Sequence, residues 1–306
     1  MSLQFIMGNS GSGKSYCLYD TVVREAIENP DKNYLVIVPE QFTMQTQKDL
    51  CLAHPKGGIM NIDVLSFGRL AYRVFEEVGQ DARVVLDDEG KNLVLRKIAG
   101  ECEKDLKVFK GNLKKQGYIS EVKSVLSEFA QYGVDFERLD DFMKEVPPES
   151  YLHYKLDDIR TIYEKFEEYL SEKYITKEEM LDVLSDAVPY SDILKGSVVA
   201  MDGFTGFTPV QNRLIGELFS VCEKVMITVT MDGRENPYVY EHPYQIFALG
   251  KQMVTSLMKI AGEKKTEIEE PICLFERPVY RFRDCSEMAF LETELFRYSG
   301  AKYNGS

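Results

Sequence analysis

The sequence predicts an α/β protein: a parallel sheet with helices on both faces, whose chain is interrupted by an all-helical insertion. Short apolar runs alternate with helical patterns over residues 1–85 and again over 190–275. Such alternation is typical of strand–helix–strand units joined by right-handed crossovers. Between these two stretches, residues 86–189 show little but helical periodicity.

The first part of the predicted sheet lies in residues 1–85. Residues 3–7 form a short apolar run, a glycine-rich turn follows, and residues 14–28 have apolar side chains at helical spacing. Residues 34–38 are an uninterrupted apolar run of the kind found in strands buried on both faces. We expect a third strand at 64–67 and a helix at 70–78.

Residues 86–189 are expected to form an all-helical inserted domain, because apolar residues recur there three and four positions apart. Charge is distributed unevenly within it. Between Lys91 and Lys123, nine basic residues stand against four acidic ones. This stretch either contacts a duplex backbone without base specificity or forms an ordinary charged helix face.

The α/β pattern resumes over residues 190–275. A strand at 197–202 ends in Asp202, a helix follows at 209–222, and alternating apolar residues predict a strand at 224–230. Residues 276–306 are expected to begin a following domain, with a strand-like run at 278–282 and a helix over 286–297.

Composition excludes several classes of protein. The chain has 306 residues, 44% of them hydrophobic and 28% charged, with a formal net charge of −13. These proportions exclude bulk disorder. No apolar stretch reaches the roughly 18 residues of a membrane span, and no basic segment with a long apolar run marks a secretory signal. Six scattered cysteines without metal-ligand spacing indicate free thiols, so a cytoplasmic location is expected.

The turn after the first strand fits the phosphate-loop pattern G-x-x-x-x-G-K-[ST]. It comprises Gly8, Asn9, Ser10, Gly11, Ser12, Gly13, Lys14 and Ser15. Glycines allow backbone N–H groups to cradle phosphate oxygens at the start of a helix, where the helix dipole is positive. Lys14 would reach the outer phosphates of ATP, and the Ser15 hydroxyl would bind Mg²⁺. Together with the alternating pattern, the motif predicts a RecA-like P-loop NTPase sheet; the alternative is a glycine-rich surface turn.

A second acidic residue usually completes such a site from the end of a neighbouring strand. Asp202 is placed to hold Mg²⁺ directly or through water, although it could instead be a helix cap or a turn residue. Many P-loop ATPases carry a carboxylate immediately after this aspartate to activate water. Here that position is Gly203, which has no side chain, so the sequence favours nucleotide binding over hydrolysis.

At this point the chain resembles a known family. The order of the phosphate loop, VPEQFT at 38–43, VLSFGRLA at 64–71 and DGFTGFTPVQ at 202–211 is similar to the N-terminal part of the B subunit of bacterial ATP-dependent helicase/deoxyribonucleases. The resemblance covers essentially the whole chain. It implies a superfamily 1 helicase-like protein, a role in double-strand break repair and homologous recombination, and a heterodimer with an A subunit.

The resemblance also implies a degenerate motor. Asp202 and Gln211 match the first and last positions of the second Walker motif of active superfamily 1 members, which makes Gln211 a candidate nucleotide sensor. Gly203 and Gly206 replace its other acidic residues. Only seven residues precede Gly8, so we expect no adenine-reading glutamine motif. Full family members continue into a second motor-like domain and a nuclease domain with an iron–sulfur cluster, so this chain is expected to be a fragment.

DNA is the partner that the resemblance implies. Five residues occupy positions associated in the family with the single-strand track: Gln41, Phe42, Thr43, Phe67 and Arg69. Aromatic rings and an arginine are suited to base stacking and phosphate contact. The alternative is that Phe42 and Phe67 belong to the core and that Arg69 is a solvated cation.

Two other function classes remain open from the residues alone. A self-sufficient P-loop kinase or NTPase acting on a small molecule is compatible with the phosphate loop and the helical insertion. A scaffold that no longer binds nucleotide is also compatible, and it would gain no stability from Mg·ATP.

Overall fold

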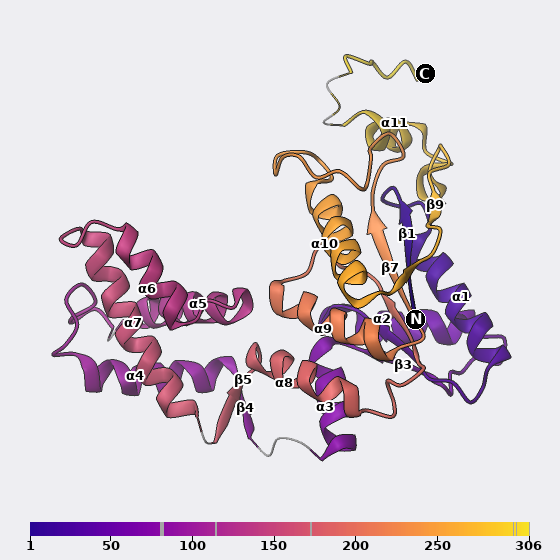
Figure 1. Cartoon of the computed structure of the whole chain (residues 1–306). Helices are drawn as coiled ribbons and strands as arrows, with labels where there is room; N and C mark the ends of the chain where they lie inside the picture. Colours follow the sequence, from indigo (N-terminus) through magenta and orange to yellow (C-terminus); the bar gives the residue numbers. More distant parts are fainter. Residues whose placement is uncertain (80–82, 114, 172, 296, 298, 306) are drawn as a thin grey trace. The chain divides into compact units, whose positions relative to one another are not determined.

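The computed structural model describes residues 1–79, 83–113, 115–171, 173–295, 297 and 299–305 (Figure 1). The chain forms two compact units. The sheet unit combines Met1–Val78, Ala187–Phe207 and Asn212–Ser306, and the helical unit combines Gly79–Asp186 with Thr208–Gln211. The sheet unit is therefore assembled from segments on both sides of the helical unit in the sequence.

The sheet unit is built on a seven-stranded sheet in which every described pair of neighbouring strands is parallel (Figure 1). The strand order is β3-β2-β6-β7-β1-β8, and β9 also pairs with β1. The strands are β1 (Ser2–Gly8), β2 (Tyr34–Ile37), β3 (Ile62–Leu65), β6 (Val198–Met201), β7 (Lys224–Thr230), β8 (Glu267–Ile268) and β9 (Ile272–Leu274). Around them lie α1 (Lys14–Glu28), α2 (Thr43–Ala53), α3 (Phe67–Val78), α9 (Pro209–Val221), α10 (Ala248–Lys264) and α11 (Ser286–Glu294), with 3-10 turns η1 (Glu40–Phe42), η2 (Val188–Tyr190) and η3 (Tyr280–Phe282).

The central strands are apolar because helices cover both of their faces. Every residue of β2 and β6 is buried, as expected for strands inside a parallel sheet. In Figure 1, α1 and α10 lie on opposite sides of β1 and β7. Leu18 and Val22 of α1 pack with Ile6 of β1 and Val36 of β2 in one core cluster. The α/β architecture predicted from the alternating pattern is confirmed.

The register of the sheet brings the ends of three strands together. Gly8, the last residue of β1, pairs with Thr230 of β7, and Met201 at the end of β6 pairs with Ile227. The Met231 N–H donates to the Gly8 carbonyl at 2.9 Å, which continues the pairing one residue further. Since parallel strands end at the same edge, the segments that follow β1, β6 and β7 meet there.

The predicted strand at 278–282 is wrong. The strand lies earlier, at β9, and the residues after it form η3. Pro278 has no N–H to give to a ladder. The Arg281 N–H donates to the Gly11 carbonyl at 3.0 Å, so this N–H binds the glycine-rich turn and does not pair with a neighbouring strand.

The helical unit contains five helices and one small sheet among the described residues. The helices are α4 (Asp88–Cys102), α5 (Gln116–Tyr132), α6 (Phe136–Glu145), α7 (Tyr151–Leu170) and α8 (Glu179–Ala187), the last residue of which falls in the sheet unit. Strand β4 (Val84–Leu86) pairs in parallel with β5 (Tyr174–Thr176). The expectation of an all-helical segment missed this pair, whose three-residue strands are too short to give a periodic signal. No described helix is long and apolar enough to cross a bilayer.

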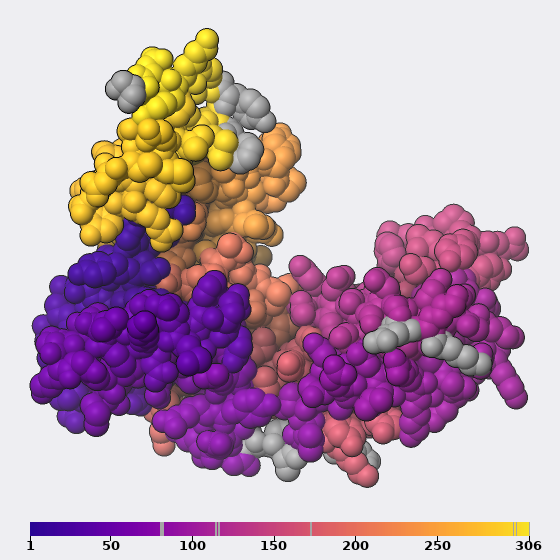
Figure 2. All heavy atoms as spheres, turned by 180° about the vertical axis from the view of Figure 1, so that it is seen from behind, coloured from indigo at the N-terminus to yellow at the C-terminus, as the bar shows by residue number. Residues whose placement is uncertain are grey.

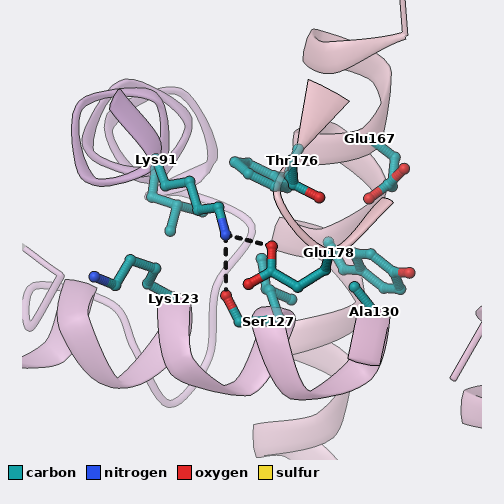
Figure 3. A pocket seen from close by; sticks show the side chains of 11 residues that line it. Lys91, Lys123, Ser127, Ala130, Glu167, Thr176 and Glu178 are labelled. Carbon is teal, nitrogen blue, oxygen red and sulfur yellow. Dashed lines mark hydrogen bonds and ion pairs between the residues drawn. The ribbon is translucent and has the colours of Figure 1, made fainter. Parts of the chain in front are cut away.

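The core of the helical unit encloses an ion pair. Leu95, Val122 and Phe166 belong to its apolar cluster. Among these helices the Lys91 side chain is only 3% exposed, and its Nζ lies 2.6 Å from Glu178 and 3.2 Å from Ser127 Oγ (Figure 3). A buried ammonium is tolerated only when charge and hydrogen bonds compensate its lost hydration, and these two partners supply both.

The same core holds a second carboxyl group. Glu167 lines the cavity that Lys91 and Glu178 also line (Figure 3). Burial, followed by the charge of Glu179 and a hydrogen bond with it, raises the pKa of Glu167 to about 7. Glu167 therefore holds a proton more readily than an exposed glutamate would.

Three of the nine basic residues counted between Lys91 and Lys123 form ion pairs within the unit. Lys91 is buried, Lys107 lies 2.9 Å from Asp157, and Lys123 lies 3.7 Å from Asp88. Lys91 therefore cannot contact a duplex, and part of the positive charge counted in the sequence is neutralised locally.

The buried pair generates the first prediction. Replacing Glu178 by Ala leaves the Lys91 ammonium buried without its carboxylate, so the free energy of unfolding should fall by about 3–5 kcal/mol. The double variant Lys91→Met/Glu178→Leu removes both charges and should recover most of this loss. Urea unfolding monitored by circular dichroism measures both.

The matched control is the exposed pair Lys144–Asp141, whose side chains are 75% and 66% exposed. Asp141→Ala should cost less than about 1 kcal/mol. Equal losses for Glu178→Ala and Asp141→Ala would contradict the role given to burial.

Candidate functional site

The glycine-rich turn between β1 and α1 has the backbone of an anion cradle. Gly11 and Gly13 adopt left-handed φ angles of +82° and +95°. Gly13 directly precedes α1, and no side chain caps the first N–H groups of that helix. These N–H groups are the positive end of the helix dipole, which favours a negatively charged group beside them.

A cleft of about 480 Å³ opens beside this turn. It lies within the sheet unit and is lined by Ser10, Gly11, Gly13, Lys14, Ser15, Tyr16, Asp202, Gly203, Phe204, Thr205, Thr228, Thr230, Tyr280 and Arg281. The structure thus brings Lys14, Ser15 and Asp202 to one cleft, although they come from distant parts of the sequence. Gly8, Asn9 and Ser12, which belong to the same motif, are not among its lining residues.

Asp202 is held in place by two hydroxyl groups. It follows β6 and is 7% exposed. Tyr19 Oη of α1 donates to its Oδ2 at 2.8 Å, and Thr228 Oγ1 of β7 donates to its Oδ1 at 2.6 Å. Burial and the neighbouring Asp202 raise the pKa of Tyr19, so this phenol remains a hydrogen-bond donor. Each carboxylate oxygen keeps capacity for a further interaction, such as a cation or a water.

Lys14 is partly desolvated at the edge of the cleft. Its Nζ donates to the Asn9 carbonyl at 2.8 Å. Burial lowers the pKa of Lys14 to about 8; Asp202 opposes this shift and the charge of Arg281 adds to it. A lysine in this position is still mostly charged at neutral pH, and a polyanion beside it would restore its charge.

Two side chains under the turn have unsatisfied acceptors. Asn9 is 1% exposed, and its Nδ2 donates to Glu292 Oε1 at 2.8 Å. Asn9 Oδ1 and Ser12 Oγ are buried without a hydrogen-bond partner in the described structure. Buried polar atoms of this kind are normally satisfied by protein groups or ordered water.

Gly203 occupies a position that a side chain would strain. Its φ is +79°, and a Cβ built there would lie 3.4 Å from Pro39 Cδ and 3.7 Å from Phe42 Cδ2. A residue with a side chain pays a conformational cost at such a φ. The backbone therefore favours glycine at this position.

Among the described residues that line the cleft, Asp202 is the one carboxylate.

Tyr280 and Arg281 are cleft residues that the sequence did not indicate. They lie in η3, and the Arg281 N–H donates to the Gly11 carbonyl. A Cβ at Gly11 would come within 2.8 Å of Arg281 Cβ, so only glycine permits this approach. No local pattern could have revealed the contact, because it joins segments at opposite ends of the chain.

The candidate DNA-contact residues come from two segments that the structure joins. Gln41 and Phe42 lie in η1, and Arg69 lies in α3. Glu40 links the two segments: its Oε1 accepts from Arg69 Nε at 3.1 Å, and its Oε2 accepts from Ser66 Oγ. Glu40 is not among the site residues predicted from the sequence.

These candidates differ sharply in exposure. Phe42 is 48% exposed, and the Arg69 side chain is 54% exposed. Phe67 is 7% exposed, with its ring centre 5.4 Å from that of Phe204 and 6.3 Å from that of Phe207. Phe67 thus belongs to an aromatic cluster with little free ring surface. Thr43 is buried, and its Oγ1 donates to the Glu40 carbonyl at 3.0 Å.

Gln211 forms a helix cap. Its Oε1 accepts from the Thr208 N–H at 3.0 Å, and its own N–H donates to Thr208 Oγ1 at 3.3 Å. This reciprocal pair is a capping box at the start of α9, with Pro209 as the first helical residue. Gln211 is not among the residues that line the cleft.

Comparison with known proteins identifies the family. The family model described as "ADDB, N-terminal" matches residues 5–292. The chain is 44% identical over 302 residues to the B subunit of the ATP-dependent helicase/deoxyribonuclease of Lachnoclostridium phytofermentans, covering 97% of this chain and 26% of that protein. It is 34% identical to the corresponding B subunits of Clostridium acetobutylicum and Clostridium tetani, again over 97% of this chain and 25% and 26% of theirs. The chain thus spans about a quarter of the length of these relatives. It belongs to the ADDB N-terminal family, as the N-terminal part of a helicase/deoxyribonuclease B subunit.

Proposed function

We propose that this chain is the ATP-binding, DNA-contacting part of a helicase/deoxyribonuclease B subunit. In the cytoplasm it would act with an A subunit and DNA in double-strand break repair and homologous recombination. One observation carries the nucleotide part of the proposal: Lys14, Ser15 and Asp202 line the same cleft. Membership of the family supports the DNA part and does not favour the alternative, a self-sufficient kinase or NTPase acting on a small molecule.

The residues of the cleft fit a Mg·ATP complex with a RecA-like P-loop arrangement. The hydroxyl of Ser15 and the carboxylate of Asp202 are the hard oxygen ligands that Mg²⁺ prefers, and they would hold it directly or through water. Bound Mg²⁺ would neutralise part of the phosphate charge. The N–H groups around Gly11 and Gly13, together with Lys14, would bind the phosphate oxygens.

Within this proposal the site is suited to bind nucleotide but lacks a base for its hydrolysis. Asp202 is buried and fixed by Tyr19 and Thr228, which suits a metal ligand more than a base that must accept a proton. Gly203 offers no carboxylate, and its backbone disfavours any side chain. The charge of Arg281 beside the cleft would strengthen phosphate binding without supplying a base.

An iron–sulfur cluster would lie elsewhere in the longer protein. Within the described part of the chain, no group of three or more His, Cys, Asp or Glu side chains is arranged to hold a metal ion. The six cysteines are free.

Nucleotide binding is tested through Lys14. At 100 times the dissociation constant, Mg·ATP should stabilise the chain by about 2.7 kcal/mol, and Lys14→Ala should lose most of this gain. Because the pKa of Lys14 is about 8, its charge is lost as the pH rises through that value. Affinity measured by calorimetry should therefore be about tenfold weaker at pH 9 than at pH 7.

Lys14→Arg is the control for the pH effect, since arginine keeps its charge over this range. It should bind with little change between pH 7 and pH 9. The nucleotide proposal would be wrong if Lys14→Ala were stabilised by Mg·ATP as much as the unaltered chain.

The role proposed for Gly203 is tested by substitution. Gly203→Glu should not raise ATP turnover, because the left-handed backbone at this position disfavours any residue with a side chain. Gly203→Ala should also lower the free energy of unfolding by about 1–2 kcal/mol. Steady-state phosphate release and urea unfolding give the two values.

Gly206→Ala is the matched control for stability, since a Cβ there meets no atom within 4 Å and needs no left-handed backbone. It should leave stability nearly unchanged. A gain of turnover in Gly203→Glu would refute the account of the site.

DNA contact is tested at Arg69 and Phe42. Arg69→Ala should reduce the salt dependence of single-strand binding by about 0.7 in log–log slope, the value for one phosphate contact. Phe42→Ala should weaken binding by about 1–3 kcal/mol while leaving the slope unchanged, because it removes stacking and no charge. Fluorescence anisotropy at several salt concentrations measures both.

The exposed Arg24 of α1 supplies the control, and Arg24→Ala should leave affinity and slope unchanged. If Arg69→Ala and Arg24→Ala behave alike, residues 66–69 are not part of the DNA track.

A further inference from the structure

The phosphate loop is held from outside by a segment near the end of the described chain. We call residues 275–295 with Arg297 the docking segment. Figure 2 shows the C-terminal residues, in yellow, lying against the N-terminal residues, in indigo. Two hydrogen bonds join the phosphate loop to the docking segment. Asn9 Nδ2 donates to Glu292 Oε1 at 2.8 Å, and the Arg281 N–H donates to the Gly11 carbonyl at 3.0 Å. The conformation of the loop therefore depends on where this segment lies.

Ion pairs with a buried aspartate hold the docking segment to the sheet. Asp232 follows β7 and is 1% exposed. Its Oδ2 lies 2.8 Å from Arg234 Nη2, 2.8 Å from Arg277 Nη2 and 2.6 Å from Arg297 Nη2. Burial alone would raise the pKa of Asp232, but the hydrogen bonds from Arg234 and the charges of Arg277 and Arg297 outweigh it and hold the pKa well below its ordinary value. Asp232 is thus a permanent anion that two arginines of the segment share.

Arg277 connects this anchor to the phosphate loop. Its Nη2 contacts Asp232, and its Nη1 lies 3.4 Å from Glu292 Oε2 and donates to Thr293 Oγ1. The other oxygen of Glu292 accepts from Asn9. The contacts run without a break from Asp232 through Arg277 and Glu292 to the first variable residue of the loop.

The docked segment delivers a cation to the cleft. Arg281 lines the cleft, and its charge is close enough to contribute to the lowered pKa of Lys14. Its backbone is fixed by Gly11, whose missing side chain leaves the necessary room. Release of the segment would remove this charge from the cleft.

We infer that Arg277 is a positioning residue of the nucleotide site: with Asp232 it docks residues 275–295 so that Arg281 faces the bound phosphates. The inference rests on the proposed nucleotide binding. Because two events that favour each other do so reciprocally, segment docking strengthens nucleotide binding, and nucleotide binding strengthens docking. The cleft is thereby coupled to the segment that ends in α11.

A double-mutant cycle on the full chain tests the inference. The dissociation constant of Mg·ATP is measured by calorimetry for the unaltered chain, Arg277→Gln, Arg281→Ala and the double variant. Arg277→Gln and Arg281→Ala should each weaken binding by about tenfold. If Arg277 acts through Arg281, the double variant should bind no more weakly than Arg281→Ala alone. Tenfold losses that multiply to a hundredfold would overturn the inference.

Arg73→Gln is the matched control. It removes an exposed arginine–aspartate pair of the same unit, with Arg73 3.5 Å from Asp63, and it should leave the affinity unchanged. If Arg277→Gln fails to fold, Arg297→Gln removes the other contact from the segment to Asp232 and should give the same non-additive loss with Arg281→Ala.

Hydrogen exchange supplies a readout that a purely structural role would not change. Mg·ATP should slow amide exchange in residues 277–292 of the unaltered chain, but not in Lys14→Ala. If Mg·ATP changed amide exchange in these residues neither in the unaltered chain nor in Lys14→Ala, the coupling would be overturned. A chain that does not bind Mg·ATP at all would overturn the proposed function as well, whereas intact binding with additive losses would overturn only this inference.

Discussion

The parallel register of β1, β7 and β6 is the constraint on which the site depends. Strand β7 lies between the strand that leads into the phosphate loop and the strand that ends before Asp202. Thr228 of β7 donates to Asp202 on one side, and Thr230 pairs with Gly8 on the other. A shift of one residue in this register would turn Thr228 to the opposite face and separate the carboxylate from the loop.

The same edge of the sheet carries both the cleft and the anchor of the docking segment. Asp232 follows β7 by two residues, so the strand that aligns the cleft also carries the anchor for the docking segment. Asp202, which follows β6, and Arg281 line the cleft beside the phosphate loop. Glu292 contacts the loop through Asn9. Charge of both signs therefore surrounds the loop.

Much of the cleft could be predicted from the sequence because its parts have local signatures. The phosphate loop needs glycines at fixed positions, and Asp202 directly follows an apolar run that forms β6. Arg281 and Asp232 had no such signature, since their partners lie far away along the chain. The strand expected at 278–282 failed for a related reason: the N–H of Arg281 serves Gly11, a contact that periodicity cannot indicate.

Exposure was the other property that the sequence could not settle. Phe42 follows one predicted strand and Phe67 lies at the end of another, and either could have been core or surface. The 3-10 turn η1 leaves the Phe42 ring half exposed, whereas α3 turns Phe67 toward Phe204 and Phe207. The burial of Phe67 depends on contacts with rings that lie far away along the chain, which the residue type alone does not indicate.

Gly203 joins these two regions of the sheet unit. It lines the cleft next to Asp202, and its Cα faces Pro39 and Phe42 of the segment proposed to contact DNA. A side chain here would strain the backbone, while its Cβ would lie in ordinary van der Waals contact with that segment. The φ angle, and not crowding by residues 39–42, is therefore what favours glycine at this position. On the proposed function, the left-handed backbone at Gly203 accounts for the missing hydrolytic carboxylate beside Asp202.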